Sequence, residues 1–272
     1  ILVMVRPFFK KVCFHFHAAG ISDLYPTLDR FSQFLFRRAY YGADLGIRLS
    51  PTSPEDCKKL HLAKEVIIPY GIEDSYATDP THETGNQSVV SILFVGLLIE
   101  SKGLLDLIRA LHLLKERGID FRAKVMGEFK TSEFEQEARS LISKLGLESE
   151  ITFLGVLVGE KKFQAFRESD IFCFPSFYES ESFPVVLLEA SCFALPIVST
   201  SWRGITSIVS ENENGFLVPI KSPEKVAGKL ELLITDPRLR MEMSERSRTI
   251  YLEKYTLSRF YANVEAAFVS IA

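Results

Sequence analysis

The sequence predicts an α/β protein built on parallel sheet, and two observations support this. From residue 89 onward, short apolar runs alternate with segments in which apolar residues recur every three or four positions, the periodicity of amphipathic helices. The short runs are apolar along their whole length, as strands are when helices cover both faces of their sheet. Expected strands are 89–98, 121–127, 151–156, 171–176, 195–200 and 214–219, and expected helices are 104–118, 133–147, 160–170, 183–194, 204–211, 222–237, 237–255 and 256–272.

The residues before 89 predict a smaller version of the same architecture. Expected strands are 10–16, 44–50 and 65–72, and expected helices are 25–43 and 53–63. These make about three strand–helix units, roughly half of an independent doubly wound domain. The segment that follows, 73–88, is polar and rich in turn formers, which is typical of a linker.

The chain therefore divides into three expected parts. Residues 1–87 form a partial Rossmann-like domain and the linker, 88–250 form a complete doubly wound domain, and 251–272 form a helix that returns to the first domain. Because the sequence starts at Ile rather than Met and offers so few units before the linker, we expect the N-terminal half of the first domain to be missing.

Composition excludes several classes of protein. The chain is 47% hydrophobic and 25% charged with a net charge of −3, so it lacks the basic excess of a nucleic-acid binder. Its longest apolar runs are shorter than the roughly 20 residues needed to span a bilayer. The four scattered cysteines have no metal-site spacing and indicate reduced thiols in a cytosolic protein.

Two glutamates flank an apolar helix in the stretch "ESFPVVLLEA". Parallel sheets bind ligands at the carboxyl ends of their strands, and here a strand end leads through Glu181 and Ser182 into the predicted helix. The free N–H groups of a helix N-terminus favour an anion, and Glu189, about two turns on, could accept hydrogen bonds from a ribose diol. A plainer interpretation stays open, in which Glu181 caps the helix and Glu189 is a solvated side chain.

Other strand ends carry polar residues or glycine at the same expected edge. Lys102 follows the strand 89–98 and could reach a phosphate, although a surface lysine is the alternative. Gly127 ends the next strand and permits close approach of a ligand to the backbone. In the first domain, His15 and His17 share one strand face, and His17, at the strand end, is the better site candidate; a packed or surface histidine is the alternative.

Together these motifs resemble a known family. The run "FVGLLIESKG … VMGE … ITFLGV … FPSFYESESFPVVLLEASCFALPIVST … GITSIVSENENGFLVP" is similar to the nucleotide-sugar domain of family 4 glycosyltransferases, which are retaining enzymes of the GT-B fold. The resemblance implies that Glu189 holds the nucleotide ribose and that Lys102 holds the diphosphate. It further implies that Glu181 and the backbone amides of Ser182 and Phe183 approach the donor sugar and phosphates.

The resemblance extends to other positions and has one departure. Gly96 and Gly127 belong to the implied donor site, and the loop around Val156 and Leu157 would meet the base through backbone groups. The family usually has Arg after the glycine of "FVG", whereas this chain has Leu97. Leaving-group stabilisation would then depend on Lys102 and the helix dipole.

The N-terminal part resembles the second half of the family's acceptor domain. "VCFHFHAAGI" is similar to the strand whose terminal histidine faces the donor sugar, and this resemblance implies that His17 is catalytic together with Lys102 and Glu181. "IIPYGIED" is similar to the family segment that opens the linker. The expected fold is therefore GT-B-like, and the expected cleft between the two parts holds His17, Lys102, Glu181 and Glu189.

The expected function is transfer of a sugar from a UDP-, GDP- or ADP-sugar to an acceptor hydroxyl with retention of configuration. We expect synthesis of surface polysaccharide or glycolipid, a saccharide or lipid-linked acceptor, no metal and no cofactor. The expected location is the cytoplasm, with peripheral association at the inner membrane face as an option. Two alternatives compete: a truncated, inactive fragment that only binds nucleotide or partners, and a dinucleotide-dependent oxidoreductase, which the lack of G-x-G-x-x-G after any strand disfavours.

Overall fold

The chain forms two compact units. The computed structural model describes residues 1–17, 20–76 and 89–272. One unit comprises Ile1–Gly71 together with Leu257–Ala272, and the other comprises Ile72–Thr256. Most of the predicted linker, residues 77–88, lies outside the described residues.

The larger unit contains a parallel sheet of doubly wound topology. In the part of this unit that the structure describes, six strands pair in the order β6-β5-β4-β7-β8-β9, and every pairing is parallel. The strands are β4 (Val90–Val95), β5 (Phe121–Met126), β6 (Ile151–Gly155), β7 (Ile171–Phe174), β8 (Ile197–Thr200) and β9 (Gly215–Val218). The predicted α/β class with parallel sheet is confirmed.

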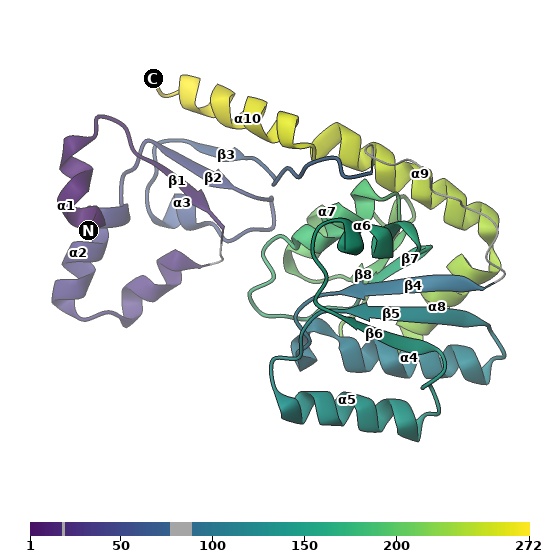
Figure 1. Ribbon diagram of the computed structural model, residues 1–272. Coiled ribbons are helices and arrows are strands. Elements are labelled where there is room, and N and C mark those ends of the chain that lie inside the picture. The colour runs from purple at the N-terminus through teal and green to yellow at the C-terminus, as the bar shows by residue number, and fades with distance from the viewer. Residues whose placement is uncertain (18–19, 77–88) are drawn as a thin grey trace. The chain divides into compact units, whose positions relative to one another are not determined.

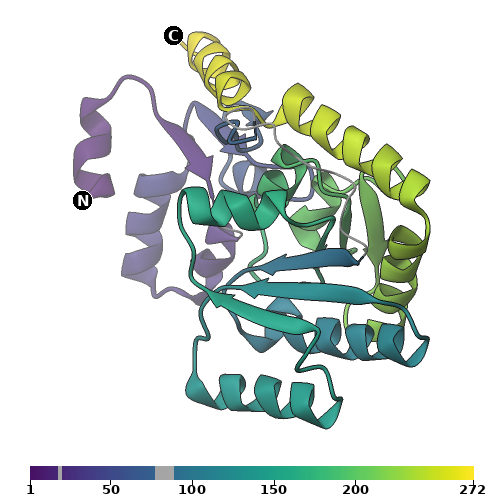
Figure 2. The same ribbon diagram turned by 45° about the vertical axis from the view of Figure 1, so that its right-hand side comes forward.

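Helices cover both faces of this sheet. Figure 1 shows α4 (Leu104–Glu116), α5 (Ser132–Lys144) and α8 (Pro223–Thr235) on one face and α6 (Glu160–Arg167) and α7 (Val185–Cys192) on the other. Figure 2 shows the same layers after a turn of the molecule. The helix α9 (Pro237–Lys254) packs on α7 and α8. This double cover explains the unbroken apolar runs, since β7 and β8 are buried at every position.

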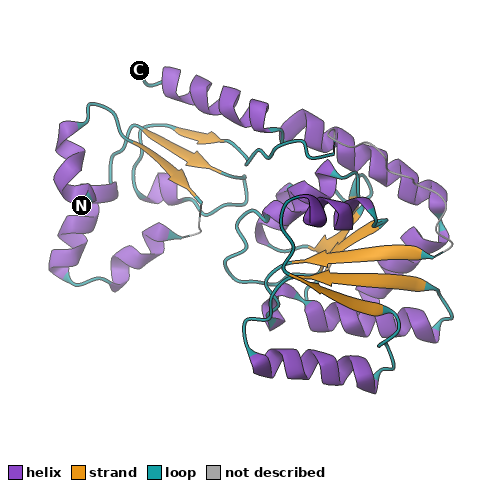
Figure 3. Ribbon diagram, in the orientation of Figure 1, coloured by secondary structure: helices purple, strands orange, loops and turns teal. Residues whose placement is uncertain are grey.

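The smaller unit has a shorter parallel sheet (Figure 3). Within the residues described, it contains β1 (Cys13–Phe16), β2 (Leu45–Arg48) and β3 (Glu65–Ile67), paired in that order. Its helices are α1 (Leu2–Val5), α2 (Arg30–Tyr40), α3 (Asp56–Lys59) and α10 (Leu257–Val269). Apolar side chains of α10, including Phe260, Val264 and Ala267, pack with Leu45 and Ile47 of β2.

In the smaller unit, two predicted helices are shorter than expected. In the segment 25–43, Pro26 lies in a 3-10 turn, and Asp29 then accepts hydrogen bonds from the amides of Phe31 and Ser32. This side-chain cap fixes the start of α2 at Arg30. In 53–63, the α-helical part is only the four residues of α3.

Two further observations concern the chain as a whole. All four cysteines lie in the described residues and are free thiols. Among the helices in the described ranges, none is both long enough and apolar enough to cross a membrane.

Candidate functional site

The site lies where the strand order of the larger sheet reverses. The chain runs outward from β4 through β5 to β6, then returns to place β7 on the other side of β4. Loops after β4 and β7 therefore lie at the point where the strand order reverses, the usual ligand position in doubly wound sheets. Lys102 follows β4 and Glu181 follows β7.

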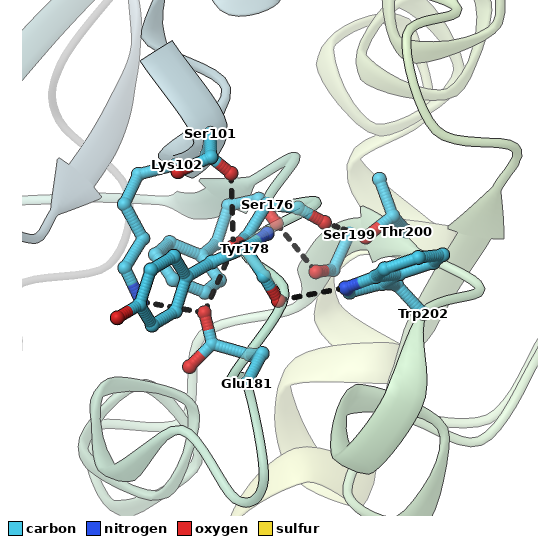
Figure 4. Close-up of polar contacts among 9 residues, drawn as sticks. Ser101, Lys102, Ser176, Tyr178, Glu181, Ser199, Thr200 and Trp202 are labelled. Atoms are coloured by element: carbon cyan, nitrogen blue, oxygen red, sulfur yellow. Dashed lines mark hydrogen bonds and ion pairs between the residues drawn. The ribbon is translucent and has the colours of Figure 1, made fainter. Parts of the chain in front are cut away.

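These two side chains form an ion pair across that position. Lys102 Nζ lies 2.6 Å from Glu181 Oε2, and the two side chains are only 15% and 8% exposed. The same carboxylate oxygen accepts a 2.8 Å hydrogen bond from the hydroxyl of Ser176, which is fully buried. Figure 4 shows the lysine and the serine both reaching the same oxygen of Glu181. The carboxylate is thus held in a fixed orientation by a cation and a neutral donor.

Aromatic rings line the lysine. Lys102 Nζ lies 4.6 Å from the ring centre of Tyr178 and 5.4 Å from that of Phe174, which favours its positive charge. The Tyr178 carbonyl accepts a 2.8 Å hydrogen bond from the indole N–H of Trp202, and the Thr200 hydroxyl donates to the Ser176 carbonyl (Figure 4). The end of β8 and the loop after it therefore support the loop that carries Glu181.

A glycine lets the loops after β4 and β7 approach each other. Gly103, between Lys102 and α4, has φ of +83°, and a Cβ there would lie 2.1 Å from the Pro175 carbonyl oxygen. The amide of Phe177 donates a 2.8 Å hydrogen bond to the Ser101 carbonyl. These backbone contacts hold the two loops together beside the ion pair.

A second ion pair joins α6 to α7. Lys162 Nζ lies 2.5 Å from Glu189 Oε1, with side-chain exposures of 24% and 17%. The other carboxylate oxygen, Glu189 Oε2, is buried and has no hydrogen-bond partner among the described residues. One oxygen of Glu189 is therefore neutralised, while the other keeps its capacity to accept.

The helix that separates the two glutamates begins later than predicted. The prediction started it at residue 183, but α7 starts at Val185 with Pro184 in extended conformation at the N-cap. A residue before proline is disfavoured in the helical region, so the helix cannot include Phe183. Glu181 and Ser182 thus lie in the loop before α7 and not at its N-terminus. Phe183 is 5% exposed and packs edge-on against Tyr255, a core contact.

The other predicted donor-site residues lie at neighbouring strand ends. Gly96 follows β4 and Gly127 follows β5, and a Cβ at Gly127 would lie 1.8 Å from the Gly96 carbonyl oxygen. The close approach that Gly127 permits is thus to a neighbouring backbone; contact with a ligand stays a prediction. Val156, just after β6, is 62% exposed, Leu157 is half-buried, and Leu97 is 45% exposed.

His17 belongs to the smaller unit. It is exposed, directly follows β1, and its Nδ1 shares a hydrogen bond with the Tyr70 hydroxyl, on whose ring it stacks with centroids 5.4 Å apart. Burial raises the pKa of Tyr70, and burial followed by repulsion from His17 lowers the pKa of His15 to about 4. That His17 faces the residues of the larger unit stays a prediction.

Sequence reasoning missed several residues of the site. Ser176, Tyr178 and Trp202 frame the first ion pair, and Lys162 completes the second. Ser176 had a signal in its position as the last residue of the predicted strand 171–176, whereas Lys162 is one of two adjacent lysines in a predicted helix. No group of three or more His, Cys, Asp or Glu side chains in the described part of the chain is arranged to hold a metal ion.

Comparisons with known proteins identify relatives of this chain. The family model described as glycosyl transferases group 1 matches residues 83–250. An uncharacterized glycosyltransferase of Haemophilus influenzae is 33% identical over 159 residues, 58% of this chain and 43% of that protein. A putative colanic acid biosynthesis glycosyltransferase of Escherichia coli, WcaL, is 29% identical over 229 residues, 81% of this chain and 54% of that protein. The chain thus spans about half the length of these relatives.

Solved structures share the fold. Anabaena Alr3699/HepE in complex with UDP aligns with a TM-score of 0.81 at 18% identity, covering 99% of this chain and 75% of that one. A glycosyltransferase from Rickettsia africae aligns with a TM-score of 0.77 at 19% identity, covering 97% and 72%. The expected GT-B-like fold class is confirmed.

Proposed function

The chain belongs to the glycosyl transferases group 1 family, and we therefore propose that it transfers a sugar from a nucleotide-diphosphate sugar to an acceptor hydroxyl, with retention of configuration. The larger unit is the donor side in this proposal. The observation that carries it is the Lys102–Glu181 pair at the point of strand-order reversal.

Each ion pair has a role in the proposal. Lys102 supplies the positive charge that stabilises the diphosphate leaving group, because charge develops there as the sugar–phosphate bond breaks. Glu181, oriented by the Ser176 hydroxyl, accepts hydrogen bonds from the donor sugar. Glu189 accepts hydrogen bonds from the nucleotide ribose, which its unpaired Oε2 supports.

The relatives support the choice of substrates. HepE is described in complex with UDP and, in a further structure, with UDP-glucose, so UDP-sugars are the first donors to test. WcaL is named for colanic acid biosynthesis, which supports a saccharide or lipid-linked acceptor in polysaccharide synthesis. We propose that the reaction takes place in the cytoplasm, with peripheral association of the protein at the inner membrane face as an option.

Calorimetry tests the donor-site proposal. The 272-residue chain is titrated with UDP, GDP and ADP, alongside the variant Glu189→Ala and the control Glu253→Ala, an exposed glutamate of α9. We expect one nucleotide to bind and Glu189→Ala to weaken it about tenfold, because a hydrogen bond between a charged group and the ribose is lost. Unchanged affinity in Glu189→Ala, with the control also unchanged, would refute the ribose role.

Transfer is measured separately from binding. Release of nucleotide from a donor sugar is followed with and without saccharide acceptors, and product anomers are assigned by NMR. Nucleotide binding without transfer would favour the binding-only alternative for this chain, whereas an inverted product would refute retention.

A further inference from the structure

The ion pair between Lys162 and Glu189 is more constrained than an ordinary surface pair. Its charged atoms lie 2.5 Å apart, and both side chains are less than a quarter exposed. Paired side chains this far removed from solvent interact more strongly than exposed ones, because water screens them less. The pair therefore influences how the Glu189 carboxylate is presented.

Packing between α6 and α7 fixes where the two residues lie. Phe193, at the C-terminal end of α7, is 1% exposed and packs against Phe163 and Phe166 of α6, with ring centroids 5.8 and 5.3 Å apart. Lys162 directly precedes Phe163 in the same helix, so the core contact sets the position from which the lysine reaches Glu189. The pairing follows from the fold and not from chance contact of two long side chains.

We infer that Lys162 is a positioning residue for ribose recognition: it holds Glu189 by Oε1, so that Oε2, which is buried and has no partner among the described residues, is left to accept hydrogen bonds from a cis-diol. This inference rests on the proposed function, in which Glu189 accepts hydrogen bonds from the ribose hydroxyls. Lys162 need not touch the nucleotide itself. Its effect is to make the site prefer ribonucleotides over nucleotides that lack the diol.

The direction of the effect follows from the burial of the carboxylate. Without the lysine, Glu189 is a mostly buried anion that has lost its counter-charge, which is unfavourable. The side chain then gains by turning toward solvent, so the diol must reorient it on binding and affinity falls. If the diol instead had to displace Lys162 from Glu189, removal of the lysine would raise the affinity for the nucleotide.

The experiment compares two probes on matched variants. UDP and 2′,3′-dideoxy-UDP, which lacks both ribose hydroxyls, are titrated into wild type, Lys162→Met, Lys162→Arg and Glu189→Ala. If wild type binds GDP or ADP in place of UDP, that nucleotide and its dideoxy analogue are used. Lys161→Met is the control, because Lys161 is the exposed neighbour on the same helix.

We expect Lys162→Met to weaken UDP binding about tenfold, equivalent to about 1.4 kcal/mol, and to change binding of the dideoxy probe less than about twofold. Lys162→Arg should retain most of the diol preference, since it retains the charge. Equal losses for both probes would mean a merely structural role, and unchanged or tighter UDP binding would also overturn the inference. If wild type and Glu189→Ala show the same diol preference, the ribose role of Glu189 itself fails, which is a separate outcome.

Discussion

The substitution Gly103→Ala tests whether close backbone approach of two loops holds the site together. Gly103 separates Lys102 from α4, and Pro175 stands one residue before Ser176 in the facing loop. A methyl group at Gly103 would lie 2.1 Å from the Pro175 carbonyl oxygen, closer than a Cβ can approach another atom. One loop must move, and both loops carry partners of Glu181.

The expected size of the effect has two parts. The left-handed φ of +83° disfavours any residue with a Cβ, at about 1 kcal/mol. Overpacking against a backbone oxygen adds about 1–3 kcal/mol, because a backbone atom cannot swing aside like the end of a side chain. The total loss in free energy of unfolding is about 2–4 kcal/mol. Gly118→Ala is the matched control: its φ is +70°, but a Cβ there meets nothing within 4 Å, so only the first part applies.

Urea unfolding of wild type and both variants measures the difference. Any effect of alanine on the unfolded chain is common to both substitutions and cancels in their comparison. Nucleotide affinity, measured under native conditions, should fall in Gly103→Ala and be retained in Gly118→Ala. Equal losses of stability in the two variants would refute the reasoning, since the contact with Pro175 would then contribute nothing.

Three further predictions follow from other contacts. Lys102→Met leaves the buried Glu181 carboxylate without its cation, so urea unfolding should show a loss of about 3 kcal/mol in free energy of unfolding; a change below about 0.5 kcal/mol would contradict this. Leu97→Arg adds a cation at the same strand edge, so calorimetric affinity for the diphosphate should not fall; a large loss with the fold intact would mean a differently shaped pocket. In the folded chain His15 has a pKa of about 4, below its usual 6.5. As pH falls from about 6.5 to 4, His15 therefore binds a proton in the unfolded chain but not in the folded one, and stability should decline over this range. His15→Asn should lose this dependence, seen as melting temperature against pH.

Elements that depend on local pattern were predictable. The strands of the larger sheet are apolar throughout because both faces are covered, and each lies within its predicted range. Helix starts were less well predicted where a single residue overrides periodicity: Pro184 delays α7, and the cap at Asp29 delays α2. Both signals are present in the sequence, but the apolar pattern continues past them and hides the boundary.

Side-chain pairing was not predictable to the same degree. Glu181 and Lys102 were found because each follows a strand end, but nothing local pairs them, since they are 79 residues apart. That contact needs the strand order, which puts β7 beside β4. Lys162 was missed because its partner, Glu189, comes from another helix. Its neighbour Lys161 is also a lysine, so the sequence does not show which of the two forms the pair.

The strand order also explains why two ion pairs gather near one helix. The sheet has two halves, β4 to β6 and β7 to β9, and α6 is the crossover that joins them. Lys102 comes from the first half and Lys162 from the crossover, while Glu181 and Glu189 lie before and within α7 of the second half. Each pair therefore joins the second half to an element that precedes it in the chain. A nucleotide that contacts both glutamates would lie along this junction, and its affinity would depend on how the two halves are packed together. Gly103 lies where the loops of the two halves meet. For that reason we expect a substitution there to change nucleotide binding as well as stability, although Gly103 itself carries no charge.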